Sequence, residues 1–98
     1  MTTTTTTTTT DTASERDVRI LVLPRGWVLV GDYRRDGDEV VLTRCAVVRI
    51  WGTTRGLGEI AAGGPTPQTF LDPCPEVRAP LAAVVMTIAC DAAKWSAL

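Results

Sequence analysis

Histidine and asparagine are absent from the 98-residue chain, and serine occurs only at Ser14 and Ser96. Without histidine the chain cannot build a Ser-His-Asp or Cys-His catalytic group, and the usual mixed Cys/His zinc sites are excluded as well. Cysteine is scarce, and Cys45, Cys74 and Cys90 form no C-x-x-C pair. An odd number of cysteines without C-x-x-C spacing argues against a disulfide framework or a metal site. It favours a reducing, cytoplasmic setting.

The chain also lacks a long apolar run. The stretch from Leu81 to Cys90 is interrupted by Thr87 and falls short of the roughly 20 residues that a membrane span needs. Residues 2–10 are all threonine, a run without an apolar face to bury, so residues 1–16 are predicted to be a disordered tail. This tail lacks the basic start and apolar centre of a secretion signal. Residues 17–98 are predicted to form one domain.

Neither sign of charge dominates, because 10 basic and 11 acidic residues leave a formal net charge of -1. A neutral domain argues against non-specific nucleic-acid binding, and no sequence-specific nucleic-acid partner is expected. The interval between Glu39 and Glu59 nevertheless holds Arg44, Arg49 and Arg55 and no acid. The preference for arginine over lysine is typical of a GC-rich genome, and it also suits bidentate recognition of anions.

The dipeptide Asp36-Gly37 separates two β-prone runs, which is a strong signal for a hairpin with a type I′ turn. A loop made of these two residues would pair Tyr33 with Val40 and Gly31 with Leu42. One face of the hairpin would then carry the core side chains, and the other face the polar ones. The predicted core face consists of Trp27, Leu29, Tyr33, Val40, Leu42 and Ala46.

The second hairpin strand is expected to continue to Trp51. If alternation holds, Val48 stays on the core face, while Cys45, Arg49 and Trp51 share the opposite one; a bulge would exchange the two sets. Arg49 and Trp51 would then project together where a Gly-rich segment begins.

Residues 18–23 are predicted to form a first strand that Pro24 ends, and residues 57–62 a helical turn that Gly63-Gly64-Pro65 ends. A short strand is expected at 69–72. Residues 81–90 match both a helical stripe and a buried strand; a strand is favoured, followed by a helical turn that carries Trp95. The predicted fold is therefore a small, mainly β domain, an antiparallel barrel or sheet with one or two short helical turns.

Residues 49–69 form the candidate ligand site. This segment is too long for an economical connector and is rich in glycine and threonine, which is typical of functional loops. Threonine hydroxyls, exposed backbone N–H groups and guanidinium groups can hold a phosphate or carboxylate, and a tryptophan can stack on a ring. Alternatively, Trp51 lies in the core, Arg49 is ion-paired and the glycines only turn the chain. The predicted ligand-binding residues are Arg49, Trp51, Thr53, Thr54, Arg55, Thr66 and Thr69.

Glu59 and Asp72 are the two acids in or beside this segment. Paired carboxylates can perform general acid–base catalysis, but no spacing argument brings these two together. The glycines match neither a phosphate-binding P-loop nor a dinucleotide fingerprint. We therefore expect no enzyme, no metal and no cofactor.

Three stretches, RGWVLVG at 25–31, VRIWGTTRGLGEIA at 48–61, and GPT at 64–66 followed by TFLDP at 69–73, make the chain resemble a group of small uncharacterised proteins encoded by phages and prophages. The resemblance implies a viral accessory protein made inside a bacterium. Small phage proteins of this size include oligomeric sponges that sequester nucleotide-like immune signals of the host, and others are minor virion components.

Two binding functions therefore compete. The first is a non-enzymatic binder of a small anionic, nucleotide-like molecule. The alternative is a structural, virion or protein-interaction module without a small-molecule ligand. A domain this small gains stability from self-association, so a homo-oligomer is expected as well.

Overall fold

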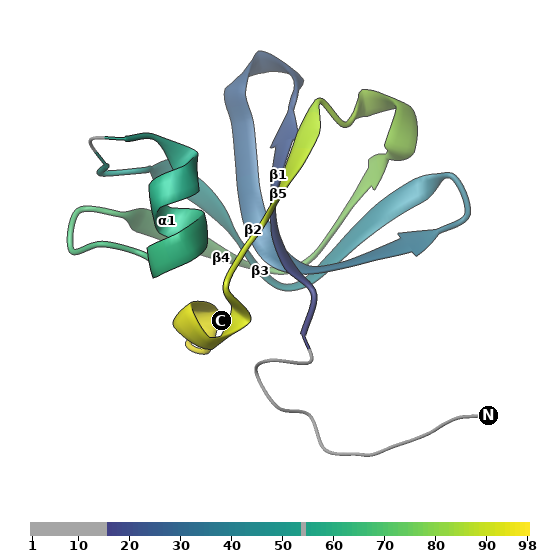
Figure 1. Ribbon diagram of the computed structural model, residues 1–98. Coiled ribbons are helices and arrows are strands. Elements are labelled where there is room, and N and C mark those ends of the chain that lie inside the picture. Colours follow the sequence, from purple (N-terminus) through teal and green to yellow (C-terminus); the bar gives the residue numbers. More distant parts are fainter. Residues whose placement is uncertain (1–15, 54) are drawn as a thin grey trace, which may run out of the picture.

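The computed structural model describes residues 16–53 and 55–98, and a single antiparallel sheet with the strand order β4-β3-β2-β1-β5 dominates them (Figure 1). The strands β1 to β3 follow one another as a meander, β4 joins the outer side of β3, and β5 joins the free side of β1. The strands are β1 (Val18–Leu23), β2 (Trp27–Asp36), β3 (Glu39–Ile50), β4 (Phe70–Pro80) and β5 (Met86–Ala89). This architecture confirms the predicted fold class.

One α-helix, α1 (Leu57–Gly63), lies in the connection between β3 and β4. The 3-10 turns are η3 (Pro24–Gly26), η4 (Leu81–Ala83) and η5 (Ala92–Trp95). The helical turn expected at 57–62 is confirmed. The preference for a strand within 81–90 is confirmed as well, because β5 occupies the middle of that stretch and η5 then carries Trp95. The strand expected at 69–72 is longer than predicted.

The hairpin between β2 and β3 exists, but its predicted register was wrong. Asp36 pairs with Glu39, so the two-residue loop is Gly37-Asp38 and not Asp36-Gly37. Gly37 has a φ of 62° and occupies the first central position, where a type II′ turn requires glycine. Tyr33 consequently lies opposite Leu42 instead of Val40. A slip of two residues keeps each side chain on its face, which is why the predicted faces were largely right.

A β-bulge interrupts β3 in the middle of this hairpin. Val30 pairs with Ala46 and Asp32 with Thr43, so Gly31 faces two residues, Arg44 and Cys45. Arg44 adopts a φ of 46°, and its guanidinium group donates two hydrogen bonds, of 2.6 and 3.0 Å, to the main-chain oxygen of Leu98. A Cβ at position 31 would collide with the side chain of Cys45, so this bulge requires glycine.

The bulge exchanges the two faces of β3, as the alternative prediction stated. Beyond it, Cys45 joins the face of Leu42, and Val48 packs with Val28 on the other face. The sheet therefore buries side chains on both sides. The helix-side cluster contains Val18, Ile20, Val28, Val30, Val48, Ile60, Ala61, Ala92 and Trp95. The strand-side cluster contains Leu21, Leu29, Val40, Leu42 and Cys45, with Tyr33, Cys74, Val77, Leu81 and Val84 packed against it.

The helix α1 and the turn η5 close the helix-side cluster (Figure 1). The Trp95 indole is 1% exposed, and its Nε1 donates a hydrogen bond of 3.1 Å to the carbonyl oxygen of Ile60. Asp91 N also donates to the carbonyl oxygen of Ala61 at 2.9 Å. These two hydrogen bonds therefore attach residues 91–95 to α1.

Arg16 is the first residue that the structure describes. Its side chain is 8% exposed, pairs with the Asp32 carboxylate at 2.7 Å and donates to the carbonyl oxygen of Trp95 at 3.3 Å. Arg16 therefore connects β2 with η5, while the threonine run lies outside the described residues. Within the described part of the chain, no helix is long and apolar enough to span a membrane.

The substitution Trp95→Phe should lower the free energy of unfolding by about 2 kcal/mol or more, because it leaves a cavity and removes a buried hydrogen bond. The matched control is Trp51→Phe, whose indole is 41% exposed and whose change should cost less than about 0.5 kcal/mol. Urea denaturation followed by circular dichroism measures both. Equal destabilisation by the two substitutions would contradict this account of the core.

Candidate functional site

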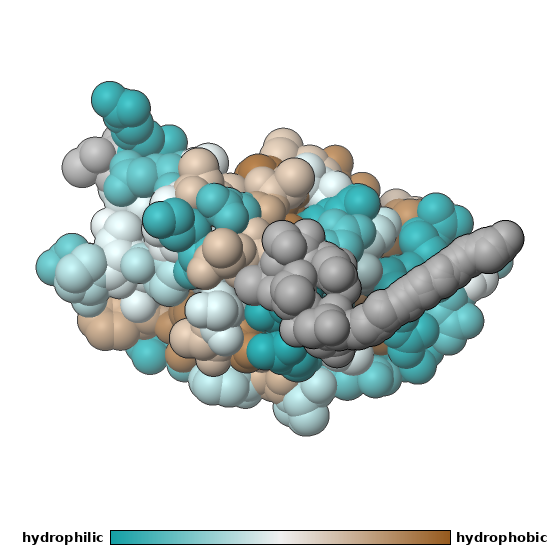
Figure 2. Space-filling view, turned by 60° about the horizontal axis from the view of Figure 1, so that its bottom comes forward, coloured by the Kyte–Doolittle hydropathy of each residue, from teal (hydrophilic) through white to brown (hydrophobic). Residues whose placement is uncertain are grey.

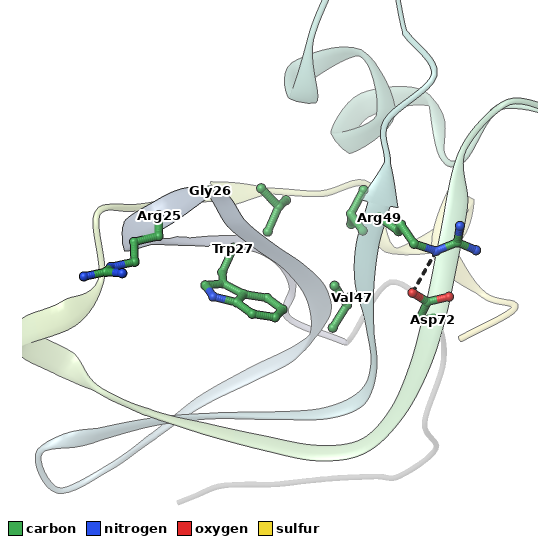
Figure 3. A pocket seen from close by; sticks show the side chains of 8 residues that line it. Arg25, Gly26, Trp27, Val47, Arg49 and Asp72 are labelled. Carbon is green, nitrogen blue, oxygen red and sulfur yellow. Dashed lines mark hydrogen bonds and ion pairs between the residues drawn. The ribbon is translucent and has the colours of Figure 1, made fainter.

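A groove of about 430 Å³ opens at the end of the sheet where β2 begins and β3 ends. The turn η3 and the strands β2, β3 and β4 all contribute to its lining, so the groove joins segments far apart in the sequence (Figure 3). The residues that line it are Arg25, Gly26, Trp27, Val28, Val47, Val48, Arg49 and Asp72.

Trp27 presents its indole ring to this groove and is 57% exposed. The alternating hydrophobic pattern predicted this residue in the core, and that prediction was wrong. Trp27 is the first residue of β2, directly after η3. An exposed tryptophan offers a large flat apolar surface on which another ring can stack.

Arg49 reaches the groove from the last part of β3. Val48 pairs with Leu71 and Ile50 with Phe70, so Arg49 is an extra residue that a second irregularity of β3 re-aims. Its Nε lies 3.0 Å from Asp72 Oδ2, and its guanidinium carbon lies 5.7 Å from the centre of the Phe70 ring. The ion-paired alternative for Arg49 is therefore observed.

The ion pair between Arg49 and Asp72 is exposed, since the two side chains are 58% and 51% accessible. Exposed pairs of this kind contribute only about 0–1 kcal/mol. A competing anion can therefore replace the Asp72 carboxylate beside the Arg49 guanidinium group, or share that group with it, at a small cost in free energy.

Arg25 supplies the second cation of the groove. It lies in η3 with a φ of 67°, between Pro24 and Gly26. The side chains of Arg25 and Arg49 extend in opposite directions from Trp27 (Figure 3). The groove thus has one flat apolar surface between two positively charged ends, and Asp72 balances one of the two charges.

Arg55, predicted to share a site with Arg49, lines a different hollow of about 520 Å³ together with Gly58, Glu59, Ala62 and Gly63. The backbone N–H of Arg55 donates to Glu59 Oε1 at 3.2 Å. Arg49 and Arg55, which were predicted to share one site, therefore line two different hollows.

The hydroxyl groups of Thr66 and Thr69 hold the two ends of the 51–69 segment together. Thr69 Oγ1 donates to the carbonyl oxygen of Trp51 at 2.6 Å, and Thr66 Oγ1 donates to that of Gly52 at 3.2 Å. Thr69 Oγ1 also accepts a hydrogen bond of 2.9 Å from Thr66 N. Gly52 has a φ of 69°, and a Cβ there would collide with the Gln68 backbone. These contacts give the two threonines a structural role; ligand contact by them stays a prediction.

The remaining residues of the predicted strip are Thr53, Thr54 and Trp51. Thr53 Oγ1 donates to the carbonyl oxygen of Gly56 at 2.9 Å, and Thr54 lies outside the described residues. Trp51 is exposed, which excludes the alternative in which it belongs to the core. Trp51 follows Ile50 in the chain, and Ile50 pairs with Phe70 on the adjacent strand β4. These three residues are 41–47% exposed. We call them the apolar edge patch.

The two carboxylates considered for acid–base chemistry border different hollows. Asp72 lines the groove and Glu59 lines the hollow beside α1. Over residues 16–53 and 55–98, no group of three or more Cys, Asp or Glu side chains is arranged to hold a metal ion.

Arg25 and Trp27, which line the groove, were not among the residues predicted to bind a ligand. The hydrophobic pattern assigned Trp27 to the core, and Arg25 lies outside the Gly-rich segment. The available signal was the order Pro24-Arg25-Gly26-Trp27, in which a tight turn precedes a strand and brings a cation and an aromatic ring to one loop tip. No protein-family model matches the chain, and a search of curated proteins finds no match.

The substitution Thr69→Val should lower the free energy of unfolding by about 1–3 kcal/mol, because the carbonyl oxygen of Trp51 and the N–H of Thr66 lose their partner. Thr69→Ser keeps the hydroxyl and should restore most of that stability. Hydrogen exchange of the 51–56 amides should accelerate in Thr69→Val and not in Thr69→Ser. Unchanged exchange in Thr69→Val would show that the hydroxyl does not close this loop.

Proposed function

We propose that this protein is a non-enzymatic binder of a small anionic molecule that carries a planar ring, such as a nucleotide. The observation that supports this function best is the exposed Trp27 indole between Arg25 and Arg49 in one groove. The ring of the ligand stacks on Trp27, and its anionic group contacts one or both guanidinium groups.

The chemistry of the groove favours this ligand class over others. Stacking of a base on an aromatic side chain contributes about 1–3 kcal/mol and does not depend on base identity. Guanidinium groups bind phosphate in a bidentate geometry. Val28, Val47 and Val48 add apolar walls, which is typical of small-molecule sites with a few polar anchors.

A binder without catalytic groups acts by holding its ligand. If the resemblance to phage-encoded proteins reflects common origin, the proposed role is sequestration of a nucleotide-like immune signal inside the infected bacterium. That role requires a dissociation constant below the working concentration of the signal, and it requires no turnover.

Calorimetric titration against a panel of linear and cyclic nucleotides tests the proposal. The wild type should bind at least one member. Trp27→Ala should weaken that binding by about tenfold, and Arg49→Ala by about tenfold to a hundredfold. At position 25 the substitution Arg25→Asn is preferred to Arg25→Ala, because asparagine tolerates the positive φ of this residue.

Two control substitutions distinguish the groove from other sites. Arg35→Ala removes an exposed strand-end arginine and should leave the affinity unchanged. Arg55→Ala should also leave it unchanged, because Arg55 borders the other hollow; a loss there would favour the originally predicted loop strip. No binding by the wild type to any nucleotide would refute the proposal.

The apolar edge patch supports the second candidate, a protein-interaction module that pairs with another copy of this chain. On the face drawn in Figure 2, hydrophobic residues lie between hydrophilic ones, so apolar side chains reach the surface of this domain. Ile50, Trp51 and Phe70 lie next to one another at the end of β3 and β4, and such clustering is typical of contact surfaces.

Light scattering at micromolar concentration should show an oligomer for the wild type, and Phe70→Ser should shift it towards the monomer. Val85→Ser is the matched control, because Val85 is 58% exposed but lies outside the patch. A wild-type monomer, or an equal shift in both variants, would argue against self-association through this patch.

A further inference from the structure

Cys45 and Cys74 lie directly opposite each other on adjacent antiparallel strands, β3 and β4. Cys45 belongs to the strand-side cluster, and Cys74 packs against the same cluster. The two side chains therefore occupy the same face of the sheet. The Sγ of Cys45 lies 3.4 Å from the carbonyl oxygen of Cys74, so this thiol is next to its cross-strand neighbour.

This arrangement meets the geometric requirement for a disulfide. Residues directly opposite each other in an antiparallel pair have Cα atoms about 4.5 or 5.5 Å apart, depending on the type of pair. Disulfides form at Cα separations of about 4.4–6.8 Å. Both types of pair fall within this range, so the bond requires rotation of the side chains and little movement of the backbone.

The strand β4 pairs with a neighbour on one side only. It is an edge strand, and Cys74 stands between Pro73 and Pro75. Neither proline has an N–H group to donate, so fewer hydrogen bonds fix this part of the strand.

The third cysteine serves as an internal comparison. Cys90 follows β5, packs against the helix-side cluster, and has its pKa raised to about 11 by burial. Its thiol is therefore protonated at neutral pH and slow to react. Cys45 is also buried, and burial, with a smaller contribution from Cys74, raises the pKa of its thiol. Cys74 is partly exposed.

We propose that Cys45 and Cys74 form an oxidisable dithiol, which peroxide converts into a cross-strand disulfide between β3 and β4. This inference does not depend on the proposed ligand. Both cysteines are free in the structure, which is the reduced form of the pair.

The chemistry proceeds in two balanced steps. The thiolate of the partly exposed Cys74 attacks one oxygen of hydrogen peroxide, breaks the O–O bond and becomes a sulfenic acid, while the leaving oxygen departs as water. The thiol of Cys45 then attacks the Cys74 sulfur, forms the S–S bond and displaces a second water. Two thiols lose two protons and two electrons, and one peroxide takes them up to give two waters.

Tryptic peptides of the whole protein test this inference, because each cysteine falls in a different peptide. Cleavage after arginine and lysine yields residues 45–49, 56–78 and 79–94. After mild peroxide treatment of the reduced protein, non-reducing mass spectrometry should find 45–49 joined to 56–78, with a loss of two hydrogens. Peptide 79–94 should keep its free thiol.

Two substitutions complete the experiment. Cys90→Ser should leave the cross-link unchanged, whereas Cys74→Ser should abolish it and leave Cys45 reduced. Because the decisive readout is the peptide pair in the wild type, the test does not depend on the folding of either variant. A cross-link that involves Cys90, disulfides only between two protein molecules, or over-oxidation of Cys74 without a cross-link would overturn the proposal.

Discussion

The fold depends on one close contact, that of Gly31 with the bulge residue Cys45. The bulge exchanges the faces of β3, so residues before it supply the strand-side cluster while Val48, beyond it, supplies the helix-side cluster. With strict alternation, Val48 would lie with Leu42 and would leave α1 and η5 without part of their packing surface. The unusual φ of Arg44 is part of the same feature, and the hydrogen bonds from Arg44 to Leu98 connect it to the end of the described chain.

The described residues of the 51–69 segment, 51–53 and 55–69, are held in part by contacts with the backbone. Its glycines and threonines were predicted to approach a ligand, yet Gly52 makes a close backbone contact and two threonine hydroxyls bond to backbone carbonyls. Thus the residue types that suit anion binding also suit the closure of a long loop, and composition alone does not separate the two. The closed loop holds α1 over the core and leaves the end of β3 open, where Arg49 reaches the groove.

Local patterns predicted the strands, the α1 turn and the mainly β class, because alternation and glycine turns are local properties of the sequence. The hairpin register was missed, since Asp36-Gly37 and Gly37-Asp38 are both plausible loops, and only tertiary packing selects between them. Trp27 was missed for a related reason: its place in the alternating pattern does not reveal that its side chain is exposed, whereas that of Leu29, two residues further along β2, is buried. The groove joins η3, β2, β3 and β4, and no sequence window contains all four.

The bulge at Arg44 and Cys45 also determines which side chains of β3 lie beside Cys74 and beside the groove. By moving Cys45 to the face of Leu42, it places this thiol beside Cys74 within one cluster. By the same exchange, Val47 lies on the face that continues towards Arg49 and Trp27, where it lines the groove. Asp72 connects the two regions, because its carboxylate pairs with Arg49 while its carbonyl oxygen accepts a hydrogen bond of 3.7 Å from the Cys74 thiol. Formation of the proposed disulfide would remove that thiol donor from the main chain of Asp72, a residue that lines the groove.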